Sequence, residues 1–213
     1  MPFDRSANRG IKTIGVIQPG IEPTPRIVLA SDIGQSFGLI GALVDASMQA
    51  NRDGKFGAML QSAHVEPPAE FLAALKASLA AQGYQTVDIA VAHGSSSLLK
   101  SYAAIATVPS DAYLDIAVVN YGYLAAGIGD STPYRPFTGM RCRLVRSSDG
   151  KVLMEDVIAY NPIGTPANTV TIAPDPQYTF VDFDALMADR GRAVDGMNKA
   201  LTDSAAAVGR LLQ

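Results

Sequence analysis

A long run of alternating and β-branched residues in the middle of the chain is the feature that most restricts the fold. Residues 112–126, AYLDIAVVNYGYLAA, are predicted to form one long strand. Residues 139–160 follow as two alternating runs separated by the turn-rich cluster SSDGK, which predicts a hairpin. The three strands would form a meander. Arginines alternate with apolar residues in the first arm of the hairpin, so we expect one face of this arm to meet water.

Shorter patterns predict the other elements. Two short apolar runs, residues 11–17 and 26–30, are typical of strands, and residues 86–92 predict another. The clearest helix is EPPAEFLAALKASLAAQG, residues 66–83, because prolines suit its first turn and a glycine suits its C-terminal cap. The remainder from Asp182 is expected to be helical.

This order of elements is not the strict alternation of a doubly wound fold. It predicts an α/β fold of the α+β type, with a mixed, largely antiparallel sheet, helices packed on one face and a long C-terminal helix. We expect residues 1–10 to be a flexible segment and residues 11–213 to form a single domain. The loop 161–177, rich in proline and asparagine, is the other segment expected to be flexible.

The segment GQSFGLIGALVDASMQA, residues 34–50, predicts a helix with two different flanks. Its bulky residues fall in one arc, which should pack on the sheet. Small residues follow the i+4 row, where a second helix from this chain or from another copy could approach closely; they are Gly34, Gly38, Ala42 and Ala46. Its central apolar run FGLIGALV is too short for a transmembrane span, which needs roughly 20 such residues.

Composition excludes several classes of function. The chain of 213 residues has a formal net charge of -3 and only 17% charged residues, so it lacks the basic surface that nucleic-acid binding requires. A single cysteine, Cys142, rules out an intrachain disulfide. Two histidines without ligand spacing predict no metal site, and no phosphate-binding loop or other cofactor motif is present.

The best candidate for catalysis is the segment VAHGSSSLLK, in which His93 precedes Ser95. With one of Ser95 to Ser97 as the nucleophile and Asp111 or Asp115 as the acid, this segment would supply the groups of a small serine hydrolase. HGSSS is not the nucleophile elbow of such enzymes, and adjacent strand residues point to opposite faces. We therefore favour a polar turn here. For Asp115 we expect a water-exposed face or an ion pair with Arg141 or Arg143.

Tyrosines concentrate in the second half of the chain. Tyrosine and arginine are the residues that anchor protein interfaces, because each joins apolar area to a polar tip. We therefore consider two interpretations, half-buried tyrosines at a sheet edge or a binding surface. The candidate residues for such a surface are Tyr121, Tyr123, Tyr134, Arg135 and Phe137.

Several segments together resemble a group of uncharacterised exported proteins of Gram-negative bacteria, many of them classed as lipoproteins. The segments are IKTIGVIQP, GQSFGLIGALVDASMQA, YLDIAVVNYGY, YRPF and DGKVLMEDVIAY. The chain is also distantly similar to small α/β domains of envelope assembly lipoproteins, including the curli secretion lipoprotein. The resemblance implies an envelope protein, tethered by lipid to the periplasmic face of a membrane, with no assigned activity. It carries over no catalytic residues.

We therefore expect a non-enzymatic cell-envelope protein that binds a protein or an envelope component and uses no cofactor. The alternatives are the small hydrolase and a carrier of an apolar ligand in a cavity between helices and sheet. The opening MPFDRSANRG lacks the features of a signal peptide. Either the protein is not exported or the sequence begins after a cleavage site, so we expect a periplasmic location with a cytoplasmic one as the alternative.

Overall fold

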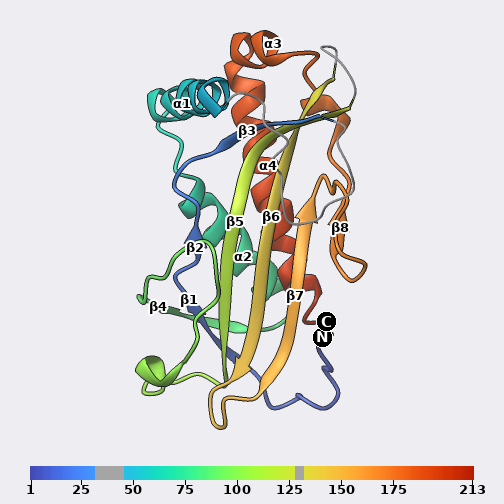
Figure 1. Ribbon diagram of the computed structural model, residues 1–213. Helices are drawn as coiled ribbons and strands as arrows, with labels where there is room; N and C mark the ends of the chain where they lie inside the picture. Colours follow the sequence, from blue (N-terminus) through green and yellow to red (C-terminus); the bar gives the residue numbers. More distant parts are fainter. Residues whose placement is uncertain (32–45, 128–131) are drawn as a thin grey trace.

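The computed structural model describes residues 1–31, 46–127 and 132–213, and in these residues a mixed sheet is backed by helices (Figure 1). The strands are β1 (Thr13–Ile17), β2 (Gly20–Ile21), β3 (Arg26–Ser31), β4 (Gln85–Ile89), β5 (Ala112–Gly127), β6 (Tyr134–Arg146), β7 (Val152–Tyr160) and β8 (Val170–Ile172). The α-helices are α1 (Ala46–Ser62), α2 (Pro67–Ala81), α3 (Phe183–Ala188) and α4 (Arg190–Arg210). Two short 3₁₀ turns are η1 (Ala103–Ile105) and η2 (Pro176–Tyr178).

The predicted meander is confirmed and forms the centre of the sheet. β5, β6 and β7 pair in antiparallel fashion, and these are the longest ladders of the sheet. Three short strands, β1, β2 and β3, pair in turn along the other side of β5, all parallel to it. β4 lies outside β1, and β8 adds a short parallel strand to β7 inside the loop predicted to be flexible. The predicted α/β class with a mixed sheet is therefore confirmed.

A β-bulge in β5 keeps its apolar residues on the helix side over the whole strand. The pairing with β6 shifts between Val118 and Asn120. Before the shift Leu114 belongs to the main core, and after it Tyr121 and Tyr123 do. The extra residue at the bulge reverses the alternation, so that even-numbered residues of β5 face the helices before it and odd-numbered residues face them after it. Simple alternation along 112–126 does not reveal this change of phase.

Helices α2 and α4 cover one face of the sheet and pack closely against each other (Figure 1). Leu75 and Leu79 of α2 and Leu201 of α4 are fully buried in the same core as the sheet residues. At Gly209 an added Cβ would collide with Ser78, whose hydroxyl donates to a backbone carbonyl of α4. A glycine that weakens an isolated helix thus allows close helix packing here.

Two predicted helices differ from the structure in their limits. Helix α1 continues to Ser62, past the predicted limit at residue 50, because Phe56, Met59 and Leu60 are buried and stabilise the helix. The helix predicted from Asp182 onward is divided at Asp189, whose side chain accepts from the amide of Arg192 and caps α4.

The Gly/Ala segment lies outside the described residues for most of its length. Gly34, Gly38 and Ala42 are not described, and Ala46 is described only as the first residue of α1. The predicted close-packing flank therefore stays a prediction. Among the helices of the described residues, none combines the length and apolar character needed to cross a membrane.

The face of the sheet opposite α2 and α4, the front face, is partly covered by residues 90–111, the covering segment. Ile105 of this segment is buried with Ile17, Ile89 and Tyr113 in a second apolar cluster. The hydroxyl of Tyr113 donates to the backbone carbonyl of Ile105 at 3.0 Å. The part of β5 around Tyr113 is therefore buried on both faces of the sheet.

Gly122 is the point where β3 approaches β5 most closely, and it yields a testable prediction. Its φ is +135°, and an added Cβ would collide with the backbone of Arg26, its register partner. We expect Gly122→Ala to lower the free energy of unfolding by about 2 kcal/mol or more, measured by urea denaturation. Gly57→Ala in α1, where a Cβ meets open space, should leave stability unchanged or raise it by up to about 1 kcal/mol. Equal stability of the two variants would contradict this account.

Candidate functional site

Asp115 is the buried polar residue around which the front face is organised. It lies in β5 on the opposite side from Leu114, and its side chain is fully buried. Its Oδ2 accepts from the backbone amide of Leu99 at 2.7 Å and from the hydroxyl of Tyr102 at 2.9 Å. Two donors from the covering segment thus replace the water that a carboxylate needs.

His93 completes the surroundings of the carboxylate. Its side chain is 6% exposed, and its Nε2 lies 2.9 Å from Oδ1 of Asp115. Neither of these two atoms has a hydrogen-bond partner among the described residues, so the contact has the distance of an ion pair without the alignment of a hydrogen bond. Nδ1 lies 2.9 Å from the carbonyl oxygen of Gly94. Both ring nitrogens therefore face oxygen acceptors.

The expectation of a water-exposed or arginine-paired Asp115 is wrong. Arg143 is the register partner of Asp115 on β6, but its Nε donates to Glu155 at 2.8 Å and its Nη1 to the carbonyl of Leu99 at 3.4 Å. The covering segment folds over the strand and buries the carboxylate. The sequence of β5 alone carries no signal for this, because the covering comes from residues preceding the strand.

The structure brings His93 and Asp115 together but places Ser95 with another partner. The Ser95 hydroxyl donates to Oε2 of Glu22 at 2.9 Å, and no hydrogen bond joins it to His93 within the described residues. A serine hydrolase needs the base in contact with the nucleophile as well as with the acid. In this arrangement the second nitrogen of the histidine faces the backbone of Gly94 instead.

The aromatic residues considered for a binding surface are buried, more deeply than the half-buried tyrosines at a sheet edge of the alternative interpretation. Tyr121, Tyr123 and Tyr134 belong to the main core, and Phe137 packs in a small cluster on the other face. The hydroxyl of Tyr123 donates to a backbone carbonyl of α4 at 2.9 Å, and burial raises the pKa of Tyr121 to about 12. Arg135 alone of the set is exposed. These tyrosines therefore pack between the sheet and the helices and stabilise the contact between them.

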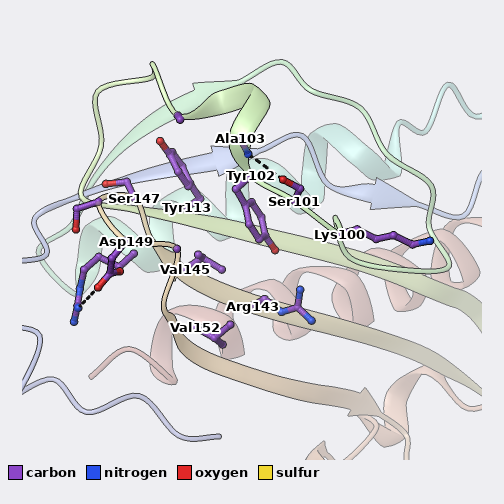
Figure 2. Close-up of a pocket in the computed structure, with 14 residues that line it drawn as sticks. Lys100, Ser101, Tyr102, Ala103, Tyr113, Arg143, Val145, Ser147, Asp149 and Val152 are labelled. Atoms are coloured by element: carbon purple, nitrogen blue, oxygen red, sulfur yellow. Dashed lines mark hydrogen bonds and ion pairs between the residues drawn. The ribbon is translucent and has the colours of Figure 1, made fainter.

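A cleft of about 550 Å³ opens on the front face beside the buried carboxylate (Figure 2). It lies between the covering segment and the turn that joins β6 to β7. Its lining residues are Lys100, Ser101, Tyr102, Ala103, Ala106, Tyr113, Arg143, Val145, Arg146, Ser147, Ser148, Asp149, Gly150 and Val152. The volume falls within the range of natural small-molecule sites.

The Asp115 contacts hold one wall of this cleft. Tyr102 lines the cleft and donates to Asp115, while its ring stacks on Tyr113 with centroids 6.3 Å apart. Burial is the main cause that raises the pKa of the Tyr102 hydroxyl, so this group stays protonated and keeps its role as a donor. Motif reasoning missed the cleft, since its walls come from segments that are distant in sequence.

The ion pair of Arg143 with Glu155 gives a pH-dependent prediction. The hydrogen bond from Arg143 is the main cause that lowers the pKa of Glu155. A carboxyl whose pKa is lowered on folding stabilises the fold above its unfolded pKa of about 4.3, and this contribution disappears as pH falls through the folded pKa. Since the Glu155 side chain is 46% exposed, the effect should be small.

We expect Glu155→Gln to reduce the loss of stability that the protein shows below about pH 4.5. Urea denaturation at a series of pH values measures it. Identical slopes for the variant and the parent protein in this acidic range would contradict the assignment.

Comparison with known proteins finds similarity in fold only. No protein-family model matches the chain, and no curated protein sequence matches it. A solved structure from Xanthomonas campestris with the family designation DUF330 is similar at 11% identity and a TM-score of 0.45, covering 93% of this chain and 81% of that one. The PelC dodecamer from Paraburkholderia phytofirmans has 16% identity and a TM-score of 0.38, covering 96% and 89%.

A third similar structure is the lipoprotein GNA1162 from Neisseria meningitidis. It has 19% identity and a TM-score of 0.34, and the alignment covers 70% of this chain and 81% of that one. Each of these similarities concerns the arrangement of the chain and not its chemistry.

Proposed function

We propose that this chain is a non-enzymatic cell-envelope protein that faces the periplasm and binds a protein or an envelope component at the front-face cleft. The envelope location is supported by the sequence resemblance to exported proteins of Gram-negative bacteria, which also favours a lipid anchor in the native form. The binding role is supported by the cleft itself.

One observation supports binding over catalysis more than any other. Neither His93 nor Asp115 nor Ser95 lines the cleft, and the contacts of all three are to groups of the fold. Of the cleft hydroxyls, that of Ser147 donates to two backbone carbonyls. The polar groups near the cleft thus fix its shape, which is what a preformed binding site requires.

Photo-crosslinking in cells tests the proposal. A photoreactive residue replaces Ser148, which is exposed at the cleft, or Glu70, which is exposed on α2 as the matched control position. We expect the protein in the envelope fraction and a crosslinked product specific to position 148. Recovery in the cytoplasmic fraction, or the same products from both positions, would overturn the proposal.

A further inference from the structure

We infer that the cleft binds an amphiphilic anion, meaning a phosphate, sulfonate or carboxylate group carried on an apolar body. This inference rests on the proposed binding role and names the class of ligand. It follows from three properties of the cleft, namely its floor, its charge and the fixed position of its walls.

The floor of the cleft is apolar. Tyr113 and Val145 line it, and both are almost fully buried, at 2% and 1% exposure. Val152 and the ring of Tyr102 extend the apolar lining. Tyr102 and Val152 are only partly buried, so a ligand with an apolar body would remove their exposed apolar area from water and gain free energy in proportion to that area, whereas a bare inorganic anion would leave it uncovered.

The charge of the lining is positive in a chain whose net charge is -3. Three lining residues are cationic, Lys100, Arg143 and Arg146, and one is acidic, Asp149. Figure 2 shows Lys100 and Arg143 at one end of the cleft and Asp149 at the other. The acidic residue of the lining thus lies at the end opposite to Lys100 and Arg143.

Asp149 pairs with Arg146 at 3.0 Å, which balances the charge at that end. At the other end Glu155 pairs with Arg143, but Lys100 makes no ion pair within the described part of the chain. An excess of cationic lining residues in a cleft with an apolar floor is the combination that a negatively charged head group with an apolar body would satisfy. The anionic group is thus assigned to the Lys100 end.

The walls are fixed before any ligand binds. Tyr102 is held by Asp115, and Arg143 is held by Glu155 and by the carbonyl of Leu99. Because these side chains are already ordered, binding would cost little further side-chain entropy. Lys100 is exposed and makes no such contact in the part of the chain that the structure describes, so its substitution should alter the ligand site and leave the fold intact.

Binding of 1-anilinonaphthalene-8-sulfonate, an aromatic sulfonate, tests the inference by fluorescence titration of the purified protein. We expect Lys100→Ala to raise the Kd about fivefold and Lys100→Glu to raise it at least about tenfold. Lys151→Ala is the matched control, since Lys151 is an exposed lysine directly after the hairpin turn that does not line the cleft. Its Kd should stay within about twofold of the parent value. Circular dichroism checks that each variant is folded.

The neutral probe N-phenyl-1-naphthylamine separates charge from apolar contact. It should bind more weakly than the sulfonate and respond equally to all three variants. The inference is overturned if the parent protein does not bind the sulfonate, or if Lys100→Glu binds it as tightly as the parent protein does.

Two further arms identify the source of the anion. Competition by soluble octyl phosphate without binding to vesicles indicates a free amphiphile, and cosedimentation with phosphatidylglycerol but not phosphatidylcholine vesicles, lost in Lys100→Glu, indicates a lipid head group. If octyl phosphate does not compete and the protein does not cosediment with vesicles, while the crosslink in cells stays specific to position 148, the ligand class is rejected and the proposed function stands.

Discussion

Asp115→Ala is expected to lower the free energy of unfolding by about 3 kcal/mol or more. The substitution leaves the amide of Leu99 and the hydroxyl of Tyr102 without their acceptor, and it leaves the buried ring of His93 without the carboxylate oxygen that faces it. Each loss occurs where water does not reach the group. Urea denaturation of the variant and the parent protein, monitored by circular dichroism, measures the difference.

The control is an exposed aspartate in an ion pair of similar length. Asp88 pairs with Lys76 at 2.6 Å, and its side chain is 65% exposed. Asp88→Ala should therefore cost less than about 1 kcal/mol. If both aspartate variants lost the same small amount of stability, Asp115 would not hold the covering segment on the sheet.

Tyr123→Ala should have the largest effect of any single substitution considered, a loss of about 4 kcal/mol. The ring is fully buried and makes edge contacts with Phe56 and Phe180, with centroids 5.7 and 5.6 Å apart. Its hydroxyl donates to the carbonyl of Ala193. Removal creates a cavity where the top of the sheet meets α1 and α4, and it leaves that carbonyl without this donor.

Tyr123→Phe separates the hydroxyl from the ring. It keeps the apolar contacts and removes one hydrogen bond, so we expect a loss of about 1 kcal/mol. Thermal denaturation of both variants gives the comparison. A stable Tyr123→Ala protein that fails only in partner binding would restore the idea of a tyrosine binding surface and would contradict the core role described above.

Much of the fold could be predicted from local pattern. The meander of β5, β6 and β7 follows from alternation around a turn-rich cluster, and α2 follows from an apolar face between prolines and Gly83, whose φ is +85°. These signals are local because strand and helix periods act on neighbouring residues. The parallel pairing of β1, β2 and β3 along β5 depends on contacts between distant residues, and no local period encodes it.

The site could be predicted only in part. Reasoning from sequence selected His93 and Asp115 as a pair, and the structure places them 2.9 Å apart. It did not predict that Asp115 is buried, because a covering segment without regular periodicity has no sequence signal. For the tyrosines, strand alternation puts Tyr121 and Tyr123 on one face of β5, but the sequence does not show that this face is buried, because its burial depends on where α4 packs.

The central claim is that Asp115 holds the covering segment in place and so forms the cleft wall. Hydrogen exchange at the Leu99 amide tests it most directly, because this amide donates to Asp115 from a part of the covering segment that lies outside any helix or strand. The amides of Leu98 and Lys100 make no hydrogen bond within the described residues. We predict that Leu99 exchanges at least about tenfold more slowly than both neighbours after correction for intrinsic rates. Equal exchange at the three positions would contradict the account.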